Sequence, residues 1–104
     1  MARVIVSDLA DADTARILGD IAREAGHLVA AKYNARIEKF YDMLADFPES
    51  RQARPKLGAH IRVGVVSPYL VIYRYAKRDD TISIIRVAHG RRELSRKFLR
   101  GDPA

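Results

Sequence analysis

Hydrophobic residues follow two different periods along this 104-residue chain. Residues 3–7 (RVIVS) form a short β-branched run, which predicts a first strand. Apolar residues then recur at helical spacing over 9–25, and Gly26 supplies a stop. A second helical stripe covers 29–47 and ends before Pro48. The two predicted helices are joined by few residues, so we expect a helical hairpin.

After a polar segment that reads as a loop, 48–58, the period changes to two. Two alternating runs predict strands at 61–65 and 69–75. The run 81–88 is dense in β-branched residues, so we expect it to lie centrally in the sheet, with both faces covered.

The order of these elements predicts an α+β fold. An N-terminal strand and a helical hairpin would pack on one face of a small, mainly antiparallel sheet of three or four strands, followed by a short C-terminal helix or tail. We expect one domain over 1–100 and a disordered tail at 101–104. The first strand is expected at a sheet edge, either beside the second strand or across from it.

Composition excludes several classes of site. The chain has no cysteine, which removes disulfides, thiolate metal sites and thiol nucleophiles. Its three histidines have no metal-ligand spacing, so we expect neither a metal nor another cofactor. No membrane span or signal peptide is recognisable, and we expect a cytoplasmic protein without membrane contact.

Charge is concentrated near the C-terminus. The chain has a net charge of +6, and six cations against Glu93 give residues 86–100 a local charge of +5. Residues 8–26 carry a local charge of −3. An excess of cations suits an acidic partner and proximity to nucleic acid, although a solvated charged surface explains it equally well.

Two motifs carry a resemblance to a known family. The run YLVIYRY begins at Tyr69, and IIRVAHGRREL ends at Leu94. Together with the order of the elements, they resemble the ParE branch of the ParE/RelE toxin superfamily. The resemblance implies the toxin of a toxin–antitoxin pair, neutralised by a cognate antitoxin that is ParD-like or similar, with DNA gyrase as the usual target.

The RelE branch implies a different function, ribosome-dependent cleavage of messenger RNA. Placed on the RelE pattern without gaps, this chain has Leu70 for a sheet arginine, Phe98 for the C-terminal tyrosine, and Ile61 and Val63 for two lysines. Only Arg92 remains of that set. Leucine and phenylalanine supply neither a proton nor a charge, so we assign no catalytic residue and favour inhibition by binding. A family member that binds antitoxin without being toxic is a third alternative.

The C-terminal stretch is the predicted site of toxicity and target binding. A short helix after the last strand should have little core to hold it and should adapt to a large target. We expect Arg91 and Arg92 to matter most. The candidate target-binding residues are Arg86, His89, Arg91, Arg92, Arg96, Lys97 and Phe98.

Several of these residues have structural alternatives. Arg86 would pair with an acid of the first helix, His89 would make a structural hydrogen bond, and Phe98 would pack back on the sheet. Tyr69, Tyr73 and Tyr75 fall on one sheet face, where core packing is favoured over stacking on bases. The residues that bind antitoxin are unknown from the sequence. We expect its helix or extended segment to cross both the sheet and the hairpin.

Overall fold

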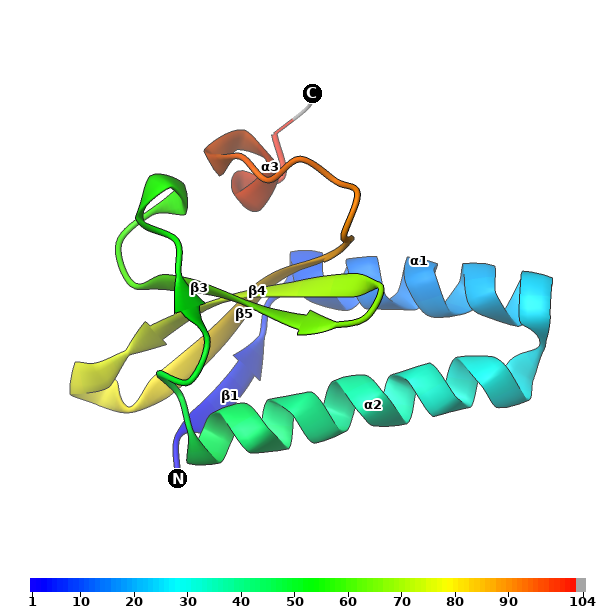
Figure 1. Cartoon of the computed structure of the whole chain (residues 1–104), viewed down its shortest axis with the longest axis horizontal. Coiled ribbons are helices and arrows are strands. Elements are labelled where there is room, and N and C mark those ends of the chain that lie inside the picture. The colour runs from blue at the N-terminus through cyan, green and yellow to red at the C-terminus, as the bar shows by residue number, and fades with distance from the viewer. Residues whose placement is uncertain (103–104) are drawn as a thin grey trace.

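The computed structural model describes residues 1–102, and its elements follow the predicted order. They are β1 (Arg3–Val6), α1 (Asp8–Ala25), α2 (His27–Asp46), β2 (Gln52–Ala53), the 3-10 turn η1 (Pro55–Leu57), β3 (Ile61–Val66), β4 (Tyr69–Ala76), the 3-10 turn η2 (Lys77–Asp79), β5 (Thr81–His89) and α3 (Arg96–Arg100). The hairpin of α1 and α2 packs on one face of the sheet, and α3 lies over the other (Figure 1). The predicted α+β fold is therefore confirmed.

A serine caps the start of α1, and a glycine forms the turn between α1 and α2. The Ser7 side chain accepts a hydrogen bond from the Ala10 N–H at 3.1 Å, which satisfies a free donor in the first turn of α1. Gly26 has a φ of 94° and makes the whole turn between the helices. Because one residue suffices, α2 begins at His27, two residues earlier than predicted.

The sheet has five strands in the order β1-β5-β4-β3-β2, where three or four were expected. The additional strand, β2, pairs antiparallel with β3 inside the segment predicted to be a loop. Both residues of β2 are exposed, so no alternation of apolar and polar residues marks this strand in the sequence. β5 is an interior strand but not the central one, which is β4. β1 pairs parallel with β5 at the edge across from β3, one of the two positions left open above.

Two apolar layers enclose the sheet. The first lies under the hairpin and contains Tyr73 of β4 together with Phe40 of α2; Tyr69 and Tyr75 are partly buried and pack against it, as predicted for core packing. Gly64 allows this close approach, since a Cβ at that position would collide with the Phe40 ring. The second layer lies under α3 and η1 and includes Leu57, Ile61, Val63, Ile72, Ala88, Phe98 and Leu99.

The C-terminal end of the described chain is held to α3. Gly101 ends the helix with a φ of 76°, and Asp102 accepts a hydrogen bond from Arg100 Nε at 3.0 Å. The rest of the expected tail, 103–104, lies outside the described residues. Among residues 1–102, no helix has the length and apolar character needed to cross a membrane.

Candidate functional site

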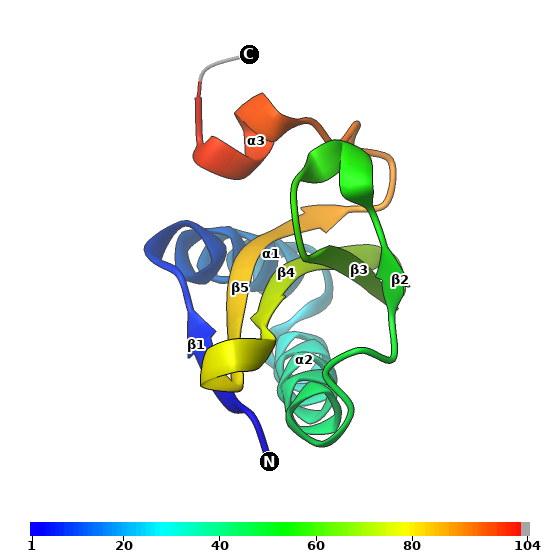
Figure 2. The same cartoon turned by 90° about the vertical axis from the view of Figure 1, so that its left-hand side faces the viewer.

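The predicted target-binding stretch leaves the end of β5 and folds back as α3 (Figure 2). The Ser95 side chain caps the helix by accepting from the Phe98 N–H at 3.1 Å. Phe98 and Leu99 are both 8% exposed and pack on the sheet. The expectation that this helix has little core to hold it is therefore wrong. The apolar residues of α3 were visible in the sequence, but the sheet face on which they pack was not.

A β-bulge in β5 shifts the pairing register with β4 beside Arg86. Ile72 pairs with Arg86 and Tyr73 pairs with Ile84, so Ile85 has no partner on β4. Such a bulge redirects the side chains beside it. Arg86 is only 8% exposed, and its guanidinium reaches both α1 and α3.

Asp13 of α1 receives this buried cation. Its carboxylate accepts from Arg86 Nε and Nη2, each at 2.7 Å, and from the Val87 N–H at 3.0 Å. β1 has already ended at Val6, so Asp13 takes the place of a strand partner for Val87. Burial alone would raise the pKa of Asp13, but the hydrogen bonds from Arg86 and Val87 outweigh it and lower that pKa. Arg86 thus makes the pair with helix one that the sequence left open, and its part in target binding stays a prediction.

Phe98 organises two arginines. The Arg86 guanidinium carbon lies 4.0 Å from the centre of the Phe98 ring, and that of Arg92 lies 4.3 Å from it. Arg86 also donates through Nη1 to the Phe98 carbonyl oxygen. A cation held on an aromatic ring keeps its N–H groups available at the ring's rim. Phe98 is itself buried and supports Arg92 from beneath, and its own part in target binding stays a prediction.

The exposed cations around α3 form what we call the basic face. Its members are Arg91, Arg92, Arg96, Lys97 and Arg100. Arg96 Nε donates to the Lys56 carbonyl oxygen at 3.0 Å, and Arg100 pairs with Asp102. Within residues 1–102, the side chains of Arg91, Arg92 and Lys97 make no hydrogen bond or ion pair. An open cavity of about 440 Å³ lies beside Arg92, Lys97 and Phe98. Of these three cations, Arg92 and Lys97 therefore border one hollow, which Glu93 and Asp102 also line.

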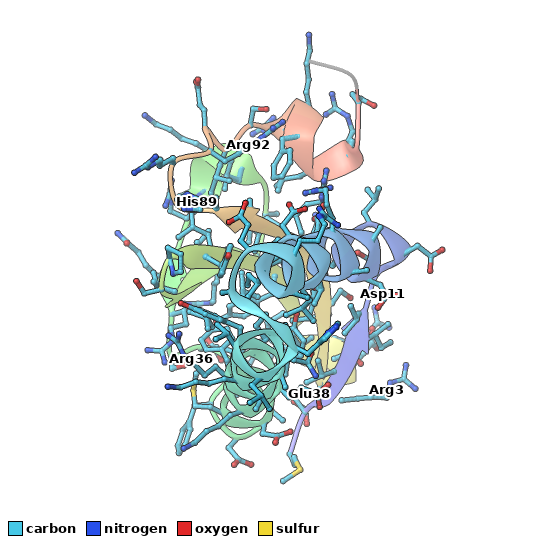
Figure 3. All side chains as sticks on the ribbon, turned by 90° about the vertical axis from the view of Figure 1, so that its right-hand side faces the viewer. Arg3, Asp11, Arg36, Glu38, His89 and Arg92 are labelled. Atoms are coloured by element: carbon cyan, nitrogen blue, oxygen red, sulfur yellow. The ribbon has the colours of Figure 1, made fainter. Side chains whose placement is uncertain are left out.

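His89 lies at the exposed end of β5, next to this face. Its Nδ1 accepts a hydrogen bond from the Arg91 N–H at 3.1 Å, and its ring meets that of Tyr69 edge to face at 5.8 Å. Figure 3 shows His89 and Arg92 at the same end of the molecule. These contacts give His89 the structural hydrogen bond that the sequence left as an alternative. Its contribution to target binding stays a prediction.

Sequence reasoning missed the residues that hold the basic face from outside the stretch. Asp13 is separated from Arg86 by 73 positions, and nothing in the sequence distinguishes it from the other acids of α1. Leu57 packs beneath α3, and its only signal was one large apolar residue in a polar segment. The packing around α3 could not be predicted from the sequence, because the contacts of Asp13 and of Leu57 join segments that are far apart in the chain.

The positions of the RelE-like residues carry hydrocarbon in the structure. Leu70 packs at the border of the second layer, and Phe98 lies inside it. Among residues 1–102, no three His, Asp or Glu side chains gather as a metal-binding group. The structure thus brings several cations together around α3, while Leu70 and Phe98 supply no proton donor at the two RelE-like positions.

Comparison with known proteins identifies the same branch. The family model described as the ParE toxin of the type II toxin–antitoxin system parDE matches residues 4–94. Toxin ParE3 of Caulobacter vibrioides is 32% identical over 95 residues, which cover 91% of this chain and 93% of that relative.

Three solved structures are similar in fold. The chromosomal ParDE toxin–antitoxin system from P. aeruginosa matches with a TM-score of 0.72 at 20% identity, over 86% of this chain and 96% of that one. The RelBE2 toxin–antitoxin complex from Mycobacterium tuberculosis matches with a TM-score of 0.61 at 20% identity, over 85% and 96%. The intact E. coli RelBE complex matches with a TM-score of 0.58 at 14% identity, over 88% and 100%. These likenesses concern the fold alone.

Proposed function

Because the chain belongs to the ParE toxin family of type II toxin–antitoxin systems, we propose that it inhibits DNA gyrase by binding through the basic face and is neutralised by a cognate, ParD-like antitoxin. It acts in the cytoplasm and breaks no covalent bond. The observation that carries this proposal is a group of three cations whose side chains make no hydrogen bond or ion pair within residues 1–102: Lys97 on α3, which is anchored to the core, and Arg91 and Arg92 in the segment just before it.

Anchoring matters because binding costs side-chain entropy. Arg92 rests on the Phe98 ring, and Ser95 caps the helix that carries Lys97. A cation that is already held in place loses less freedom when it meets a carboxylate or phosphate. An acidic target surface is therefore attracted by the field of the whole face and is then bound by preorganised groups.

A gyrase supercoiling assay tests this proposal. The purified toxin should inhibit supercoiling, and the purified antitoxin encoded beside it should reverse the inhibition. The double variant Arg91→Ala with Arg92→Ala should lose tenfold or more in potency, because truncating central charges of an interface costs more than about 1.4 kcal/mol. Its stability should change by less than about 1 kcal/mol, as is usual for surface substitutions.

The matched control is Arg36→Ala with Arg78→Ala. Arg36 also rests on an aromatic ring, 5.1 Å from the centre of Tyr33, and Figure 3 places it away from Arg92. This variant has the same net charge as the test variant and should stay fully toxic. Equal loss in both variants would make the effect one of net charge alone. A toxic protein that leaves gyrase active but cleaves messenger RNA on ribosomes would contradict the proposal in favour of RelE-like activity, and a folded protein without toxicity would favour a partner for antitoxin only.

A further inference from the structure

The outer edge of β1 is open. Within residues 1–102, β1 is the terminal strand of the sheet and pairs only with β5. The N–H groups of Arg3 and Ser7 donate toward β5, to the carbonyl oxygens of Asp80 and Ile84 at 3.0 Å each. By the alternation of a parallel ladder, the N–H and C=O groups of Val4 and Val6 point outward. An edge of this kind is a template for another strand.

A groove runs beside this edge, between β1 and the hairpin. It is a cavity of about 350 Å³ with an apolar floor and an acidic rim. The β1 groove, as we call it, is defined by Val4, Val6, Asp11, Ile37, Glu38 and Asp42. Its lining contains three acids and no cation, in a chain whose net charge is +6. Figure 3 shows Asp11 and Glu38 on the β1 side of the hairpin, with Arg36 on the other side of α2.

Within residues 1–102, neither the groove acids nor the outer edge of β1 has a bonding partner. Within residues 1–102, no ion pair joins Asp11, Glu38 or Asp42 to a cation. Val6 is 38% exposed, and its neighbour Ile5 is 42% exposed, although both are large apolar residues on a strand. Tyr41 also lines the groove, and its covered hydroxyl has no hydrogen-bond partner in the described chain. Burial raises the pKa of Tyr41 to about 12, so it remains a donor at neutral pH.

We propose that the β1 groove binds an extended, basic segment of a partner protein, which adds to the sheet as a strand beside β1. Outward N–H and C=O groups match the backbone of a strand, and alternate side chains of that strand would fall over the groove. Lysine or arginine at these positions would meet Asp11, Glu38 and Asp42. Nucleic acid and anionic lipid are disfavoured because their phosphates would face the same three acids. Resting on the proposed function, the partner is the antitoxin, and the groove is separate from the basic face.

Calorimetric titration with the antitoxin encoded beside this chain tests the edge and the rim separately. Val6→Pro removes one outward N–H without touching the bonds to β5, and circular dichroism checks that the variant folds. The rim variant removes three charges without changing size: Asp11→Asn, Glu38→Gln and Asp42→Asn. Its matched control removes three exposed acids elsewhere: Asp20→Asn, Glu24→Gln and Asp79→Asn.

We expect the edge variant and the rim variant each to weaken antitoxin binding about tenfold at low salt, and the control less than twofold. The effect of the rim variant should shrink as salt is raised. Gyrase inhibition by all these variants without antitoxin should equal that of the wild type. If the antitoxin binds every folded variant as tightly as the wild type, or loses equal affinity in the rim and control variants, the proposal is overturned.

A second probe separates this proposal from the proposed function. Peptides of alternating lysine and valine, or of alternating glutamate and valine, are titrated into isotopically labelled protein, and the amide resonances of Val4 and Val6 are followed. Only the lysine peptide should shift them. If the antitoxin does not bind the wild type, a shift with the lysine peptide would support the groove while the proposed pairing with antitoxin fails. If neither peptide shifted these resonances in that case, the proposed binding of a strand at the β1 groove would be overturned.

Discussion

The basic face and the β1 groove both hold charged side chains without an ion-pair partner among residues 1–102, four cations in the first and three acids in the second, but the two regions hold them differently. The cations stand on α3 or in the segment just before it; Phe98 and Leu99 of this helix are buried, and Arg92 rests on the Phe98 ring. The acids of the groove project from α1 and α2 beside β1, which has no outer neighbouring strand in the described part of the chain. The difference teaches that the basic face depends on the core for its shape, whereas the groove acids are free to change without loss of fold.

The first prediction concerns the buried ion pair of Asp13 and Arg86, which lies beneath the basic face. Asp13→Ala should destabilise the protein by about 3–5 kcal/mol, because it leaves the buried Arg86 charge uncompensated. Denaturant unfolding measures the change. Asp20→Ala on the same helix is the control, since its partner Arg23 and its own side chain are both exposed. That change should cost at most about 1 kcal/mol. Equal losses would mean that the Arg86 pair does not anchor α3.

The second prediction uses acid on the same pair. The pKa of Asp13 is lowered in the folded protein from a reference of 3.8, so its contribution is fully present at neutral pH. The contribution should decline as the pH approaches the reference value and disappear as the pH falls through the lowered native pKa. The loss should be smaller than in Asp13→Ala, because a protonated carboxyl still accepts hydrogen bonds. Asp13→Asn should therefore show a flatter stability profile between about pH 5 and pH 2, and an unchanged profile would contradict the assignment.

The third prediction separates the two roles of Phe98. Phe98→Leu keeps an apolar side chain in the second layer but removes the ring that supports Arg92. We expect a loss of about 1–2 kcal/mol in unfolding free energy. Toxicity should fall further than this stability loss explains, and antitoxin binding at the β1 groove should stay unchanged. Growth assays together with calorimetry check the split, and parallel losses of toxicity and antitoxin affinity would join the two regions into one surface.

The sequence predicts whatever a local period can encode. The hairpin, the three long strands and the cluster of cations followed from neighbouring residues, and the structure contains them all. The bulge at Ile85 and the Asp13–Arg86 pair depend on contacts between distant segments, so no window along the chain reveals them. The β1 groove was missed for the same reason, because Asp11 of α1 lies far in sequence from Glu38 and Asp42 of α2, and the two helices bring them together only when they pack beside β1.

The smallest expected effect concerns Tyr41, in the floor of the β1 groove. Its hydroxyl is buried without a partner in the described chain, and leaving a polar group in that state costs free energy. Tyr41→Phe should therefore leave the free protein as stable as the wild type or stabilise it by up to about 1 kcal/mol.

Tyr73→Phe is the control with the opposite sign, because the Tyr73 hydroxyl donates to the Pro48 carbonyl oxygen at 2.9 Å. That change should cost about 1 kcal/mol by leaving less hydrogen bonding in a buried site. Urea unfolding of both variants, on the same day and in the same buffer, measures the difference between them. If Tyr41→Phe proved as destabilising as Tyr73→Phe, the Tyr41 hydroxyl would have a partner inside the protein, and the floor of the groove would be a satisfied part of the core instead of a surface open to a strand.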